Sequence, residues 1–92
     1  MTRARTIEDA AAGLLPPVLV ACVRQRTPLG PLPDQPHLRA RAVGLTRELL
    51  VSLLQALWMN EEATARRLAV EAQLVVRRHR LTFTEIVTGR VA

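Results

Sequence analysis

The chain contains 92 residues, carries a formal net charge of +5 and is 49% hydrophobic. This length suits one domain, residues 1–92, and excludes two. The aromatic residues are Trp58 and Phe83 alone, and Leu, Val and Ala dominate the apolar set. The composition therefore predicts an all-α fold, a small bundle of about four to five helices. No apolar run approaches the ~20 residues that a membrane-spanning helix needs, so we expect no membrane partner.

Two short helices are predicted at the start of the chain. The stretch Thr6-Ile7-Glu8-Asp9 resembles a capping box, which predicts a helix that begins at Thr6 and runs towards Leu15. Pro16 and Pro17 must interrupt it, because an interior proline removes a backbone hydrogen bond, whereas a proline in a first turn does not. We expect a second helix from about Pro17 to Arg26.

The single cysteine, Cys22, falls within the second predicted helix. A lone cysteine excludes an internal disulfide, and its apolar surroundings predict a small buried side chain. This usage fits a reducing compartment, so we expect a cytoplasmic protein. Residues 19–22 also resemble a lipoprotein cleavage box, but the acidic residues and prolines before them do not suit a signal peptide.

The segment 27–36 is rich in proline and cannot form a helix. Closely spaced prolines favour extended geometry, so the segment is interpreted as a stiff connector. Recognition as a proline-rich peptide is the alternative.

Two longer helices should follow, over residues 37–59 and 61–80. Between them, Asn60 is a good N-cap residue followed by two carboxylates, which favours a helix break and an antiparallel hairpin. One continuous helix is the alternative. A last short helix is predicted after Leu81, with Thr82 or Thr84 as its cap and Gly89 at its end.

The sequence offers little for catalysis. Its histidines, His37 and His79, each lie among arginines and are interpreted as solvated or helix-capping side chains. One cysteine, two distant histidines and scattered carboxylates provide no metal site. Phosphate-binding and dinucleotide-binding motifs do not occur. We therefore expect no enzyme, no metal, no cofactor and no small-molecule substrate.

The two long helices carry apolar residues outside their main stripes, which suggests a protein partner. Val51 and Trp58 share a flank of the first, and Val70 and Leu74 lie opposite the main stripe of the second. Apolar residues framed by arginine are typical of protein interfaces. The predicted interface, which we expect to form a homodimer, comprises Val51, Trp58, Val70, Leu74, Arg66, Arg67 and Arg77.

A small DNA- or RNA-binding protein is the alternative. All 13 basic residues are arginines, which suit phosphate partners, although a GC-rich genome explains the absence of lysine most simply. A basic helix face could follow a phosphate backbone. Its predicted contacts are Arg66, Arg77, Arg78 and Arg80.

Two resemblances agree with this alternative. Residues 80–86, after an Ala-rich helix, resemble the loop and last helix of the histone fold, which would imply a DNA-binding dimer with one long central helix. The opening Thr6-Ile7-Glu8-Asp9-Ala10, followed by 19–21 and 24–26, resembles the omega subunit of bacterial RNA polymerase. That resemblance would imply an assembly subunit that clamps a larger chain.

Overall fold

The computed structural model describes residues 6–25 and 38–91, and this part of the chain is entirely helical or irregular, with no strand. The predicted all-α fold is confirmed. The helices are α1 (Ile7–Leu14), α2 (Pro17–Arg24), α3 (Leu38–Trp58), α4 (Glu62–His79) and α5 (Phe83–Thr88). The predicted connector 27–36 and His37 lie outside the described residues.

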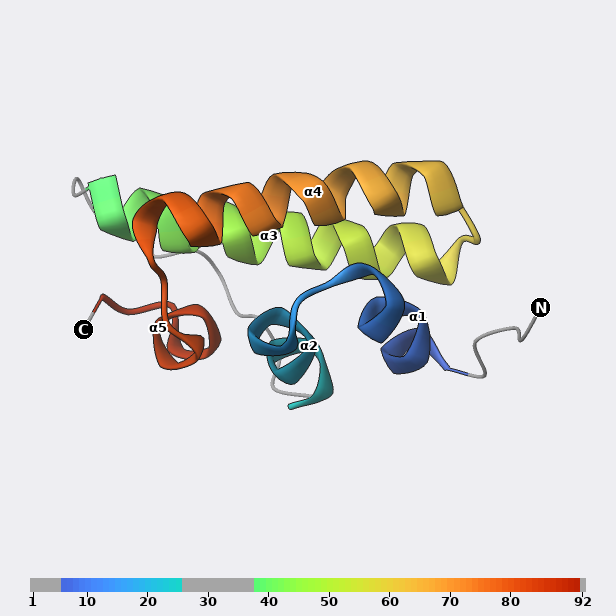
Figure 1. Ribbon diagram of the computed structural model, residues 1–92, viewed down its shortest axis with the longest axis horizontal. Helices are drawn as coiled ribbons and strands as arrows, with labels where there is room; N and C mark the ends of the chain where they lie inside the picture. Colours follow the sequence, from blue (N-terminus) through green and yellow to red (C-terminus); the bar gives the residue numbers. More distant parts are fainter. Residues whose placement is uncertain (1–5, 26–37, 92) are drawn as a thin grey trace.

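The hairpin of α3 and α4 forms the long axis of the molecule (Figure 1). The three short helices lie in a row along α3, on the side away from α4 (Figure 1). Most of the buried side chains surround α3, because α3 packs against α4, α1 and α5. The core is built mainly from Leu, Val, Ala and Ile side chains, with Leu19, Val43, Leu50, Leu53 and Ile86 at its centre.

The predicted break between the two long helices is confirmed, but Asn60 plays a different part in it. Asn60 has a φ of 59° and lies just past the end of α3, while Glu61 occupies the N-cap of α4 without a side-chain cap bond. The N–H groups of Asn60 and Glu61 donate to the carbonyls of Leu57 (3.2 Å) and Ala56 (2.8 Å). This pair of bonds is the Schellman motif that ends helices. Asn60 thus closes α3 because asparagine tolerates the left-handed conformation.

The same motif ends α4. Arg80 has a φ of 50°, and the N–H of the next residue, Leu81, donates to the carbonyl of Val76 (3.1 Å). Leu81 and Val76 are both buried, which is the apolar contact that usually accompanies this ending. The chain therefore turns sharply from α4 into α5.

The short helices begin as predicted. The Thr6 hydroxyl accepts a hydrogen bond from the N–H of Asp9 (3.1 Å), and Pro17 occupies the first turn of α2. Thr82 caps α5 in a full capping box with Glu85, and Gly89 ends the helix with a φ of 73°.

Two further expectations can be compared with the fold. In the ranges 6–25 and 38–91, no helix is both long enough and apolar enough to cross a lipid bilayer. The continuous central helix implied by the histone resemblance is contradicted, because the chain reverses at residues 59–61.

Candidate protein interface

The side of α4 that faces away from α3 is largely uncovered. Among the described helices, α3 is the only one that α4 contacts extensively. The buried stripe of α4, formed by Ala65, Ala69, Ala72 and Val76, therefore faces α3. At about 100° per residue, Val70 and Leu74 lie on the opposite side, where they are 55% and 59% exposed. The exposure predicted for both side chains is confirmed.

Charged residues surround these two apolar side chains. Arg66 lies 3.6 Å from Glu62 in an exposed ion pair one helical turn away. Arg67, Glu71, Arg77 and Arg78 are also exposed. We call the whole surface the outer face of α4, and it consists of Glu62, Ala63, Arg66, Arg67, Val70, Glu71, Leu74, Arg77 and Arg78.

The other predicted apolar pair, Val51 and Trp58, is also exposed, at 37% and 75%. It lies elsewhere, however. Arg47 marks the side of α3 that faces α5, because its guanidinium donates to the carbonyls of Ile86 and Val87. Val51 and Trp58 continue that side of α3 beyond Arg47, by one and three turns of helix. The structure therefore separates the four predicted contacts into two surfaces, one on each long helix.

Leu45 shares the apolar stripe of α3 with the buried Leu49 and Leu53, but this side chain is 45% exposed. Leu38, in the first turn, and Met59, just after the last, are exposed as well. The apolar stripe of α3 is wider than the surface that α4 covers, so the side chains at the edge of the stripe stay exposed.

The proposed arginine stripe for nucleic acid is interrupted. Gln73, between its arginines, donates a hydrogen bond to the carbonyl of Leu14 (2.8 Å) and so faces α1. Arg80 lies beyond the end of α4 in the left-handed conformation, outside the helical spacing. Arg77 and Arg78 remain exposed on α4, and Arg66 pairs with Glu62.

Two arginines in α3 connect it to the ends of the neighbouring helices, which sequence reasoning did not predict. Arg39 donates to both carboxylate oxygens of Glu85 (2.7 Å each) and to the carbonyls of His79 (2.6 Å) and Arg80 (3.0 Å). Hydrogen bonding to Glu85 raises the pKa of Arg39 above its ordinary value. Arg47 is buried and binds the end of α5. Both guanidinium groups are therefore bound within the fold, although the Arg39 side chain remains 40% exposed.

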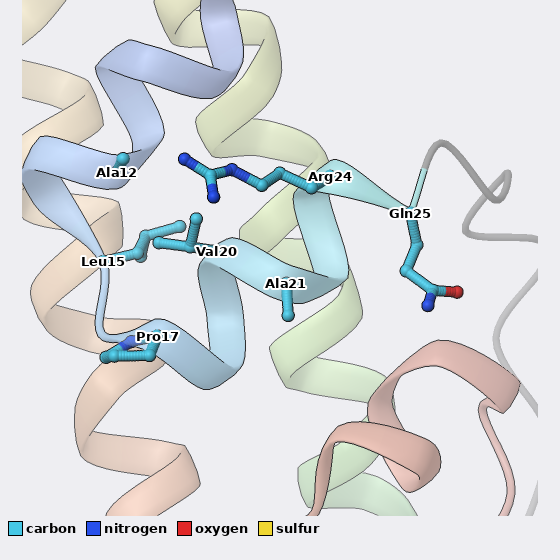
Figure 2. Close-up of a pocket in the computed structure, with 7 residues that line it drawn as sticks. All are labelled: Ala12, Leu15, Pro17, Val20, Ala21, Arg24 and Gln25. Carbon is cyan, nitrogen blue, oxygen red and sulfur yellow. The ribbon is translucent and has the colours of Figure 1, made fainter.

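A shallow groove of about 650 Å³ opens between α1 and α2. Figure 2 shows Arg24 extending across it towards Ala12, while Gln25 points away. The remaining lining residues, Leu15, Pro17, Val20 and Ala21, are apolar or small. Cys22 is buried nearby in α2, as predicted, and this burial raises the pKa of its thiol to about 11. At neutral pH it is therefore a poor nucleophile.

The described residues contain no cluster of three or more His, Cys, Asp or Glu side chains that could hold a metal ion. Comparison of the chain with protein families, with curated proteins and with solved structures found no match.

Proposed function

We propose that this protein is a non-catalytic interaction or assembly module that self-associates through the outer face of α4. The observation that carries the proposal is the exposure of Val70 and Leu74, each more than half accessible on a helix whose one extensive contact among the described helices is with α3. Small proteins rarely leave neighbouring apolar side chains open without a partner. Covering these two side chains contributes on the order of 1 kcal/mol each.

The surrounding arginines support the same proposal. Arginine is enriched at protein interfaces because its planar head pairs with carboxylates and its stem covers apolar surface. Arg67 and Arg77 flank Val70 and Leu74 from two sides of the helix. A partner that buries the apolar pair would therefore also meet guanidinium groups.

A DNA- or RNA-binding protein is the second candidate, and the exposure of Arg77 and Arg78 favours it. Three features weaken it: the interrupted stripe, the hydrogen bonds that hold Arg39 and Arg47 within the fold, and the position of Trp58 on the other long helix. Base stacking needs aromatic side chains beside the basic groups.

The two candidates differ in how they respond to salt. We expect light scattering to give a molar mass above that of the monomer at both low and high salt, since apolar contacts persist while phosphate contacts weaken steeply. The exposed pair should be replaced together, as Val70→Ser with Leu74→Ser, and this variant should be monomeric. Leu38→Ser is the matched control because Leu38 is also exposed but lies on α3.

Two results would overturn the proposal. One is an oligomer whose mass is unaffected by Val70→Ser with Leu74→Ser. The other is a monomer that binds a random DNA duplex, or a single-stranded RNA, with an affinity that falls as salt rises. Trp58→Ala separates the two surfaces: if this change alone disrupts the oligomer, the interface lies on α3.

A further inference from the structure

We infer that two copies of this chain pair through their outer faces of α4 in antiparallel orientation, with the two-fold axis near Val70. The inference rests on the proposed function and specifies its partner, orientation and register. It follows from the order of charges along α4 and from which of these charges are exposed.

The outer face of α4 is accessible along its whole length. In Figure 1, α4 forms one long edge of the molecule, and α1, α2 and α5 lie beyond α3. A second helix can therefore approach α4 without meeting another described helix. Since α4 has 18 residues and a helix rises about 1.5 Å per residue, the shared contact can extend for about 27 Å.

A parallel pairing is disfavoured by charge. In a parallel pair, residues on the contact line meet their own copies, but each flank of the outer face lies beside the opposite flank of the second copy. Arg66 would then lie beside Arg67 of the second copy, and Arg77 beside Arg78, and symmetry would repeat both contacts. Four repeated like-charge contacts around only two apolar side chains would oppose association.

An antiparallel pairing with its axis near Val70 brings opposite charges together. A two-fold axis between Ala69 and Val70 places residues at equal distances before and after it next to each other, to within one residue, and keeps each flank beside its own counterpart. On one flank, Arg67 lies beside Glu71 of the second copy. On the other, Glu62 lies beside Arg77 of the second copy. Symmetry repeats both contacts, which gives four ion pairs around the central valines.

The charges also select the register, that is, which residues of the two helices lie side by side. A shift of the axis to residue 72 would place Val70 against Leu74 of the second copy, a reasonable apolar contact. That shift would also place Arg66 near Arg77 and Arg67 near Arg78 of the second copy, and symmetry would repeat both like-charge contacts. Exposed ion pairs contribute little individually, so their role here is to choose among arrangements of similar apolar contact.

The two helices bury only a small area in this register, so we expect a weak, reversible dimer. Leu74 would lie between Ala63 and Arg67 of the second copy, where it can cover the arginine stem. The concentrations tested should therefore span ~10 µM to ~1 mM.

A charge-reversal cycle followed by sedimentation equilibrium tests the register. Arg67→Glu alone, and Glu71→Arg alone, should each weaken dimerisation about tenfold, because both convert two attractive contacts into repulsive ones. The double variant should recover to within about threefold of the natural chain, since the pairs are restored with their signs exchanged. Circular dichroism checks that helix content is retained. The matched control is Glu48→Arg, an exposed charge reversal on α3, which should leave dimerisation unchanged.

Cysteine cross-linking provides a second readout that does not depend on charge. With Cys22 replaced by Ala, Val70→Cys should form a disulfide-linked dimer under mild oxidation, because the two-fold axis brings residue 70 next to its counterpart. Leu74→Cys should not, because the two copies of residue 74 would be about 13 Å apart along the helices.

The outcomes separate this inference from the proposed function. If the chain oligomerises and Val70→Ser with Leu74→Ser abolishes the oligomer, but the charges show no rescue and residue 70 does not cross-link, this arrangement is wrong while the interface on α4 stands. A chain that is monomeric up to ~1 mM also overturns it. Rescue by the double reversal together with cross-linking at residue 70 supports both.

Discussion

The guanidinium of Arg39 binds the carboxylate of Glu85, which lies 46 residues later in the sequence, with a hydrogen bond of 2.7 Å to each carboxylate oxygen. Glu85 is 1% exposed, and the same carboxylate also accepts hydrogen bonds from the N–H and hydroxyl of Thr82 (3.0 Å each). Because Arg39 also binds two carbonyls at the end of α4, one side chain connects the start of α3, the end of α4 and the start of α5.

This connection predicts a loss of stability when its acidic member is neutralised. Glu85→Gln preserves the size of the side chain but removes the charge that Arg39 and the capping box both use, so we expect the thermal midpoint to fall by ~5–10 °C. Glu8→Gln, in the first turn of α1 and without such a partner among the described contacts, is the control. An unchanged midpoint for Glu85→Gln would show that the connection contributes little.

A second prediction concerns Gly89, where α5 ends. A Cβ at this position would lie 3.2 Å from the Cζ atom of Arg47, and the φ of 73° disfavours any side chain. Gly89→Ala should therefore lower the free energy of unfolding by about 1–2 kcal/mol in urea denaturation. Gly13→Ala is the matched control, because nothing lies within 4 Å of a Cβ there and α1 is regular. That substitution should be neutral or slightly stabilising, and equal losses at both glycines would refute the explanation.

The local features of this fold could be predicted from the sequence because each depends on neighbouring residues. Thr6 caps α1, Pro17 opens α2 and Gly89 ends α5, as their positions indicate. Helical periodicity likewise identified Val70 and Leu74 as exposed.

The remaining features depend on contacts distant in sequence. In the sequence, Arg39 and Arg47 resemble solvated charges on a helix. Their partners, the carboxylate of Glu85 and the last carbonyls of α5, become their neighbours only in the folded chain. Leu45 belongs to the apolar stripe of α3, and only the limited coverage by its neighbours leaves it open. For the same reason, the sequence could not show that Trp58 and Leu74 belong to different surfaces.

The end of α3 offers a stabilising substitution. Asn60 holds a φ of 59°, a conformation that glycine adopts without the steric cost of a Cβ. Asn60→Gly should therefore raise the free energy of unfolding by about 0.5–1 kcal/mol, whereas Asn60→Ala should lower it. Urea denaturation of the pair measures both effects. If alanine proved as stable as glycine, the backbone at residue 60 would not be left-handed in solution.

The last prediction concerns the free energy of unfolding at alkaline pH, where the composition leaves few other side chains that titrate. The chain contains no tyrosine, and all 13 of its basic residues are arginines, so no tyrosine or lysine titrates between pH 9 and 11. Burial raises the pKa of Cys22 from 9.0 to about 11. In this window the unfolded chain releases the thiol proton while the folded chain retains it. The unfolded state therefore binds fewer protons, and the free energy of unfolding must fall as pH rises.

We expect a decrease of up to about 2–3 kcal/mol between pH 9 and 11, because each pKa unit corresponds to about 1.4 kcal/mol. Urea denaturation at intervals of pH measures the slope. Cys22→Ala removes the thiol and should abolish the slope, although it lowers stability at every pH by loss of packing. A thiol reagent gives an independent check at pH 8, since Cys22 is 3% exposed and should react much more slowly in buffer than in urea. A slope that persists in Cys22→Ala would assign the alkaline loss of stability to another group.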